Sequence, residues 1–252
     1  MKKFVSIILF VSMLVVLVVG CSNEYAGTSV EKETKTESTN KKASTKEEKK
    51  EAKLEIVEQT SGSWVDSIGT VWVHSAAMFK NTGNAPIEIG ETQMNYKGQD
   101  GSVLGTSTMI YAVPSIVKPG ETAFIGESTI LDGQTDPNNF KETTYNFGFD
   151  KTTEDPVLLE TSVVQGIKGD EYSPYKVTGM VKNITKTKQD DIRLAAGLFD
   201  QDGKLIGVFN GSVDIGLNPN GEAGFDLSYP EISKEAAARI VKVEVKAYGF
   251  SF

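Results

Sequence analysis

An internal repeat constrains the fold of this 252-residue chain more than any other feature. Asn81 precedes Gly101, the glycine of an Asp-Gly pair, by 20 positions, and Asn183 precedes Gly203 by the same 20 positions. Further motifs recur in the same order. Lys-Pro-Gly-Glu at 118–121, followed by Phe124, matches Asn-Pro-Asn-Gly-Glu at 218–222, followed by Phe225. Phe-Gly-Phe at 147–149 matches Tyr-Gly-Phe at 248–250. Because several independent marks keep an offset near 100 residues, the chain is predicted to contain two related modules in tandem.

Each copy has the period-two pattern of antiparallel strands. Apolar residues of one parity precede the second Asp-Gly pair: Ile192, Leu194, Ala196 and Leu198. Valines alternate with Lys and Glu over residues 241–246, as in a strand with one buried face. In the first copy the parity changes across Gly90, which predicts a bulge or break there. About seven short strands in about 100 residues predict an immunoglobulin-like sandwich for each copy.

Turn and cap residues separate the predicted strands. The Asp-Gly pairs at 100–101 and 202–203 predict tight hairpin turns, because glycine adopts a positive φ without steric cost. One short helical signal precedes the last strand of each copy, with Asp136 and Ser233 as the predicted N-caps. The sequence therefore predicts an all-β chain of two antiparallel sandwiches.

The second copy resembles a known bacterial family. It contains Gly-Met-Val-Lys-Asn at 179–183, Leu-Phe-Asp at 198–200 before the Asp-Gly pair, Leu-Asn-Pro at 217–219, and Phe225. These marks resemble the FxLYD domain, a small β-sandwich common in extracytoplasmic lipoproteins. The resemblance covers residues 157–252, with Leu-Phe-Asp in place of the family's Leu-Tyr-Asp. The first copy has Met-Asn-Tyr-Lys at 94–97 instead and is interpreted as a diverged copy. The resemblance implies a fold and no catalytic residues.

The N-terminus resembles a lipoprotein signal. Lys2 and Lys3 precede an apolar run over residues 4–19, which is shorter than the roughly 20 residues of a spanning helix. The run ends in Val-Val-Gly-Cys, a tetrad similar to the lipobox of bacterial prolipoproteins, and Cys21 is the only cysteine. We therefore expect residues 1–20 to be a cleaved signal peptide and Cys21 to carry a lipid. The alternative is an uncleaved signal anchor.

A charged tether follows the cysteine. Residues 22–53 hold eight Lys, seven Glu and almost no large apolar side chain, so residues 21–53 are predicted to be a disordered spacer. The first sandwich is expected over residues 54–150, a linker over 151–156, and the second sandwich over 157–252. The Lys/Glu/Thr-rich tether favours a Gram-positive protein on the outer face of the cytoplasmic membrane. In a two-membrane cell, Ser22 would instead favour the outer membrane.

The remaining charges narrow the function classes. When the tether and the two lysines of the signal, Lys2 and Lys3, are left out, 16 basic and 27 acidic side chains remain. The net charge of this part is 16 − 27 = −11, which argues against nucleic-acid binding. His74, the only histidine, lies in a strand-like run and is expected at a strand surface or edge. Asp200 opens a stretch like a calcium loop, but Gly211 stands where a ligating Glu would be needed, so a turn is expected. No catalytic residue, metal site or cofactor is predicted.

Aromatic residues are the best candidates for recognition. Trp64 lies in a Gly/Ser-rich stretch interpreted as a loop, with Trp72 nearby, and Tyr172 and Tyr175 lie in the matching stretch of the second copy. Such side chains can anchor a partner or stack on a sugar, and the alternative is that they cap the sandwich ends.

We expect a non-catalytic binding or assembly module of the cell envelope, joined to the membrane through the Cys21 lipid and acting on an envelope protein or polymer. The alternatives are a carboxylate-dependent envelope hydrolase and a structural spacer. The short polar link over residues 150–156 predicts a jointed rod of two modules, with any binding surface at the joint or on the first module.

Overall fold

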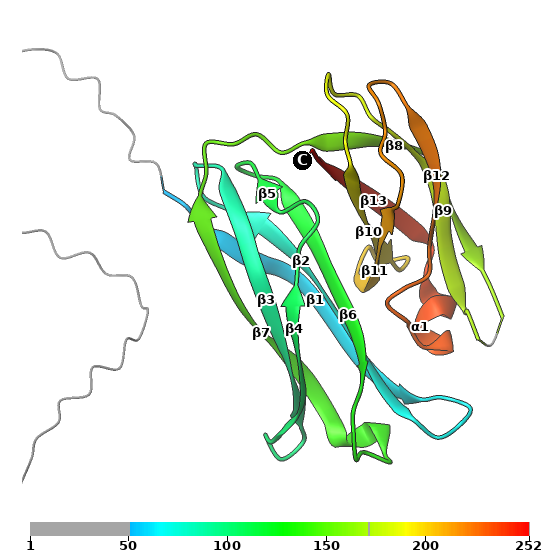
Figure 1. The fold of residues 1–252 in the computed structure, drawn as a ribbon. Helices are drawn as coiled ribbons and strands as arrows, with labels where there is room; N and C mark the ends of the chain where they lie inside the picture. The colour runs from blue at the N-terminus through cyan, green and yellow to red at the C-terminus, as the bar shows by residue number, and fades with distance from the viewer. Residues whose placement is uncertain (1–50, 171, 252) are drawn as a thin grey trace, which may run out of the picture. The chain divides into compact units, whose positions relative to one another are not determined.

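The computed structural model describes residues 51–170 and 172–251. The predicted signal peptide, Cys21 and the tether up to residue 50 lie outside this range. No helix in the described part of the chain is long and apolar enough to span a membrane. The described residues belong to one compact unit and are mostly antiparallel strands, which confirms the predicted all-β class (Figure 1).

Residues 54–151, called the first half here, form two sheets. One sheet has the order β1-β2-β6, and in the other β3 pairs with β4 and β5 and also with β7. The strands are β1 (Leu54–Val65), β2 (Val71–Asn81), β3 (Ile87–Gly98), β4 (Val103–Ile110), β5 (Ile116–Val117), β6 (Thr122–Ile130) and β7 (Phe140–Lys151). A core that includes Phe79, Ile87 and Tyr96 fills the space between the sheets.

Residues 158–250, the second half, form a folded sheet of order β11-β10-β13-β8-β9-β12. The start of β8 pairs with β13, and the rest of β8 pairs with β9, so this strand joins the two faces of the sandwich. The strands are β8 (Leu158–Lys168), β9 (Tyr175–Lys182), β10 (Asp191–Phe199), β11 (Leu205–Val213), β12 (Glu222–Leu227) and β13 (Lys242–Phe250). The predicted face of β10 is fully buried in a separate core.

The strand order is the same in both halves, as the sequence repeat requires. The order β1-β2-β6 corresponds to β8-β9-β12, and β7-β3-β4 corresponds to β13-β10-β11. The predicted helical signals are the 3₁₀ turn η1 (Pro137–Asn139), capped by Asp136, and helix α1 (Lys234–Arg239), capped by Ser233. The predicted turn glycines Gly101 and Gly203 both have positive φ, and the register of β3 against β7 shifts between Ile89 and Thr92, next to Gly90.

One matched pair in the repeat is not structurally equivalent. Ala123 pairs with Phe79 as Ala223 pairs with Val181, so Phe225 corresponds to Ile125 and not to Phe124. A shift of one residue places a side chain on the opposite face of a strand. Phe124 therefore points away from the core of the first half, whereas Phe225 is part of the core of the second half.

Phe124 belongs to a third apolar cluster, which joins the two halves. It contains Ala76, Val113 and Phe124 of the first half and Ala195, Phe199, Leu205, Val208 and Tyr248 of the second half. Strand β11 lies against β1, β2 and β6, so β2 is buried on both faces. The expectation of a jointed rod with a polar joint is therefore wrong: the halves pack through apolar sheet faces, and we call this contact the junction.

Three glycines allow the two halves to approach closely at the junction. A Cβ atom on Gly126 would lie 2.6 Å from the Val208 carbonyl oxygen, and one on Gly197 would lie 2.7 Å from the Phe124 ring. A Cβ atom on Gly207 would lie 2.9 Å from His74 Nε2. These distances are below van der Waals contact, so the absence of a side chain at these positions sets the separation of the sheets.

Candidate binding cavity at the junction

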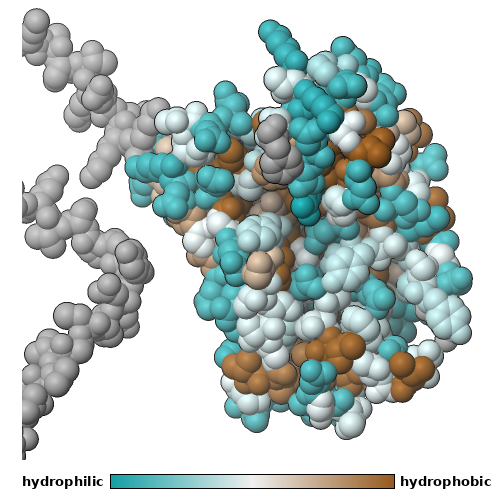
Figure 2. Space-filling model, in the orientation of Figure 1, coloured by the Kyte–Doolittle hydropathy of each residue, from teal (hydrophilic) through white to brown (hydrophobic). Residues whose placement is uncertain are grey.

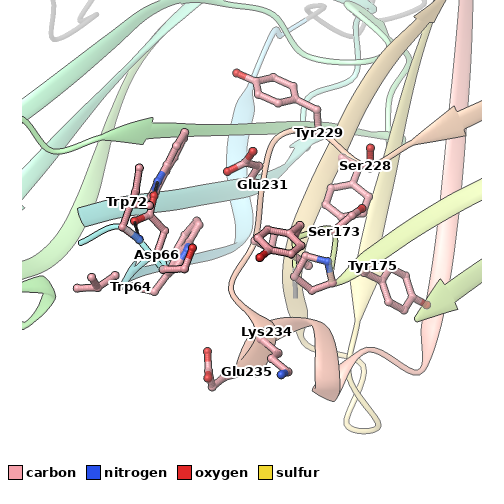
Figure 3. Close-up of a pocket in the computed structure, with 17 residues that line it drawn as sticks. Trp64, Asp66, Trp72, Ser173, Tyr175, Ser228, Tyr229, Glu231, Lys234 and Glu235 are labelled. Atoms are coloured by element: carbon pink, nitrogen blue, oxygen red, sulfur yellow. Dashed lines mark hydrogen bonds between the residues drawn. The ribbon is translucent and has the colours of Figure 1, made fainter. Parts of the chain in front are cut away.

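The four aromatic residues predicted for recognition line one cavity between the two halves. Trp64 and Trp72 come from the first half, and Tyr172 and Tyr175 come from the second half. The volume is about 640 Å³, within the roughly 300–1,000 Å³ typical of ligand sites. We call it the junction cavity; Figure 3 shows Trp64 and Trp72 on one side and Ser173 and Tyr175 on the other.

The two tryptophans form a paired aromatic surface. They lie opposite each other in the register of β1 and β2, and their rings are stacked with centroids 6.3 Å apart and an interplanar angle of 15°. The expectation that Trp64 lies in a loop is therefore wrong. Glycine and serine at 61–63 resemble a loop in composition, but pairing with β2 continues through Val65 and overrides that local preference.

Asp66 fixes the orientation of this pair. Its Oδ2 accepts a hydrogen bond from Trp72 Nε1 at 3.0 Å, and its Oδ1 accepts hydrogen bonds from the backbone N–H groups of Ile68 and Thr70. The hydrogen bond from the Thr70 backbone is the main cause that holds the pKa of Asp66 below its usual value. The carboxylate therefore stays charged, and the indole N–H of Trp72 is already used inside the turn.

The equivalent hairpin of the second half forms part of the opposite wall. Asp170 Oδ1 accepts hydrogen bonds from the backbone N–H groups of Tyr172 and Ser173, much as Asp66 does in the first half. Tyr172 is 82% exposed, whereas Tyr175 begins β9 and is 6% exposed. Tyr175 packs on Phe209 within the core, so it serves as a wall of the cavity and fits the capping alternative better than recognition.

The segment from β12 into α1 contributes residues that the sequence did not single out. Tyr229, Glu231, Ile232, Lys234 and Glu235 all line the junction cavity. Strand β12 ends at Leu227, and Tyr229, two residues later, is 53% exposed. Its hydroxyl donates a hydrogen bond to Glu127 of the first half. The Tyr-Pro-Glu sequence after the strand is the only signal that could have marked this turn.

His74 lies at the junction and not at a strand surface or edge, so that expectation is wrong. The Val208 backbone N–H donates to His74 Nε2 at 3.3 Å, which leaves the proton on Nδ1 to donate to Ser128 Oγ at 2.8 Å. The Ser128 hydroxyl in turn donates to the Glu231 carbonyl oxygen at 2.5 Å. Burial lowers the pKa of His74 to about 3, so the ring is neutral and joins the halves through a chain of hydrogen bonds.

A second cavity of about 840 Å³ also lies between the halves. Its lining is more apolar and includes Met109, Tyr111 and Phe250, with Tyr229 shared between the two cavities. The surface view shows hydrophilic and intermediate residues over most of this face, with separate hydrophobic patches at its lower end and at its upper right (Figure 2). Of these two cavities, the aromatic candidates from the sequence line the junction cavity and not the second one. Trp64 also lines a smaller neighbouring cavity of about 180 Å³, together with His74.

Two carboxylates of the second half, Asp200 and Asp191, have structural partners. Asp200 Oδ1 accepts hydrogen bonds from the backbone N–H groups of Asp202 and Lys204, which confirms the turn interpretation. Asp191 pairs with Arg193 at 2.8 Å. Within the described part of the chain, no three or more His, Cys, Asp or Glu side chains group in a way that could hold a metal ion.

Comparisons with known proteins assign no family. No family model matches the chain, and no curated protein matches it. Among solved structures, a calcium-binding mutant of Bacteroides uniformis beta-glucuronidase 2 is 12% identical over 78% of this chain, with a TM-score of 0.21. The same enzyme covalently bound to cyclophellitol-6-carboxylate aziridine is 10% identical over 73% of this chain, with a TM-score of 0.20. The chain spans 30% and 28% of those chains, and TM-scores this low do not establish a shared fold.

Proposed function

We propose that the protein is a lipid-anchored, non-catalytic binding module of the cell envelope and that it binds its partner in the junction cavity. The convergence of aromatic residues carries this proposal. Tyr172 belongs to the second half and is far along the sequence from Trp64 and Trp72 of the first half, yet all three line one cavity. Large aromatic side chains supply much of the energy in binding sites because they bury a large area at little entropic cost.

The geometry supports a preformed site. Asp66 and Asp170 hold the two hairpins that carry the aromatic residues, and the junction between the halves is apolar and closely packed. A site that is already ordered loses less entropy when it binds. The half-buried tryptophans and the exposed Tyr172 leave aromatic surface available to a partner.

The anchor and the family resemblance are part of the proposal. Support for the anchor is the Val-Val-Gly-Cys tetrad, in which Cys21 is the only cysteine of the chain. Support for an FxLYD-like second half is the Leu-Phe-Asp motif, whose leucine is fully buried in the core and whose aspartate closes the following turn. The lipid would hold the protein at the membrane, and the charged tether would let the junction cavity reach a partner.

Site-specific photo-crosslinking in the native cells tests this function. A photoreactive benzoylphenylalanine at position 172, on the cavity wall, is expected to give a discrete adduct. The same group at position 103, which is also exposed but lies outside the junction cavity, is expected to give none. The adduct should be lost when Trp64→Ala is added. Cys21→Ala should abolish lipid processing, which leaves unprocessed precursor in the membrane or a shed soluble form.

The crosslinking experiment needs a folding control, and certain outcomes would contradict the proposal. The Trp64→Ala chain must retain a cooperative melt, so that a lost adduct reports a lost site and not a lost fold. Equal adducts at positions 172 and 103, or an adduct that is indifferent to Trp64→Ala, would exclude the junction cavity as the binding site. Metabolic labelling with a fatty acid that marks the native and the Cys21→Ala proteins equally would exclude the lipid anchor.

A further inference from the structure

The junction cavity combines aromatic faces with an excess of negative charge. Asp66, Glu231 and Glu235 line it together with one cation, Lys234, which gives three negative and one positive charge, a net charge of −2. In Figure 3, Glu231 and Glu235 lie toward opposite edges of the space beside the tryptophans. Within the described residues, the side chains of Glu231 and Glu235 have no hydrogen bond or ion pair, so both can accept hydrogen bonds from a ligand.

This combination discriminates between classes of ligand. An anionic group would be repelled by the carboxylates at close range, where electrostatic interactions are stronger than in bulk water. A neutral group would gain nothing from the net charge. A cation gains from both features, because the faces of aromatic rings carry negative potential and attract positive groups.

The form of the aromatic surface discriminates further among cations. The rings of Trp64 and Trp72 are stacked close to parallel, with centroids 6.3 Å apart, so each ring has a flat face and the pair does not enclose a sphere as a box of rings would. A planar guanidinium group stacks on such a surface and also carries N–H donors for carboxylates, whereas a quaternary ammonium group has no donor. The Trp72 N–H group is already used by Asp66, so this ring offers a ligand its face.

We propose that the junction cavity binds an arginine side chain presented by a basic segment of a partner protein. The guanidinium group lies on the Trp64–Trp72 surface and donates hydrogen bonds to Glu231 and Glu235. This inference rests on the proposed function and names the chemistry of its partner. Binding then requires both halves, because the tryptophans belong to the first half and the glutamates to the second.

The protein carries its own reporter for this interaction. It has two tryptophans, and both line the junction cavity, so tryptophan fluorescence reports on a ligand that contacts this pair. We would titrate the chain from residue 22 onward with a blocked tri-arginine peptide. The matched control ligand is a tri-citrulline peptide, which has nearly the same shape without the charge. The expected result is a saturable fluorescence change with tri-arginine that weakens as salt is raised, and no saturable change with tri-citrulline.

A pair of matched variants tests the carboxylates. Glu231→Gln with Glu235→Gln should weaken tri-arginine binding about tenfold, because charged hydrogen-bond acceptors bind guanidinium groups more strongly than neutral ones do. The control, Glu142→Gln with Glu154→Gln, removes the same charge outside the junction cavity and should leave the affinity within about twofold. Thermal melts of both double variants establish that each is folded.

Several results would overturn the inference. An equal response to tri-arginine and tri-citrulline would show that charge has no role, and equal weakening by both double variants would show that the site is elsewhere. A response to neutral chitotriose without one to tri-arginine would assign the cavity to glycans. In that case, a crosslinked adduct at position 172 in cells would still support the proposed function. If neither the adduct nor a saturable fluorescence change with any of these ligands is observed, both proposals are wrong.

Discussion

At the scale of single residues, His74 is a buried titratable side chain that joins the two halves. It is 5% exposed, and its ring joins Val208 of the second half to Ser128 of the first. A protonated ring would have to donate from both nitrogens, but the Val208 N–H is itself a donor aimed at Nε2. The junction therefore requires the neutral form, in agreement with the pKa of about 3 that burial imposes on His74.

The buried histidine predicts acid sensitivity. An unfolded chain takes up a proton on His74 below about pH 6.5, whereas the folded chain resists this until about pH 3. The unfolded state then binds more protons in this window, so the free energy of unfolding falls as pH drops from about 6.5 toward 3. At pH 4.5 the loss due to this group is on the order of 2–3 kcal/mol.

Because the chain has a single histidine, proton NMR can follow its ring directly between pH 7 and pH 4. We expect no titration of the ring while the chain stays folded, and a shallower acid loss of stability in His74→Gln than in the native chain. A ring that titrates with a midpoint near 6.5 would show that His74 is not at a closed junction.

At the scale of elements, the two copies use the same side chain to hold the same connection. Asn81 Nδ2 donates to the carbonyl oxygens of Ala85 and Val117, and Asn183 Nδ2 donates to those of Thr187 and Leu217. Both asparagines are fully buried: Asn81 is the last residue of β2, and Asn183 directly follows β9. This role explains why the asparagine recurs at the same distance from the Asp-Gly turn.

The equivalence of the two asparagines gives a paired prediction. Asn81→Ala and Asn183→Ala should each lower the free energy of unfolding by about 1–3 kcal/mol, because each leaves buried carbonyl groups without a donor. Asn146→Ala, at an exposed position of β7, should change it by less than about 0.5 kcal/mol. Urea denaturation measures all three. A large effect at only one of the two buried sites would contradict the structural equivalence.

Local sequence signals predicted most elements but little of the junction. The Asp-Gly turns, the helix caps and the buried face of β10 depend on residues close in sequence, and the structure agrees with them. The second buried face of β2 depends on contacts with β11, more than a hundred positions away in the chain. The nearly continuous apolar run over residues 71–79 was the signal for a strand buried on both faces.

The candidate site was predicted in its residue types but not in its assembly. Trp64, Trp72 and Tyr172 were recognisable as large aromatic side chains in or near predicted loops, and they do line one cavity. Glu231 and Glu235 could not be found, because isolated acidic residues in a turn and a short helix are common on protein surfaces. Only the packing of the two halves brings these glutamates to the tryptophans.

At the scale of the whole molecule, the junction determines whether the site exists before a partner arrives. Side chains of both halves bury each other in one apolar cluster, and the Leu205 backbone N–H donates to Glu58 across it at 2.6 Å. A junction of this kind disfavours relative motion of the halves, whereas the short polar link alone would permit it. The central claim is therefore that the two halves form one rigid unit with a preformed cavity between them.

Electron–electron double resonance tests that claim most directly. The chain from residue 22 onward has no cysteine, so spin labels can be attached to cysteines placed at Val103 in the first half and Ile215 in the second, both exposed. We predict a single narrow distribution of distances between the labels, which broadens when Val208→Asp disrupts the junction. A broad or bimodal distribution in the native chain, unchanged by Val208→Asp, would show that the halves move independently and that no preformed junction cavity exists.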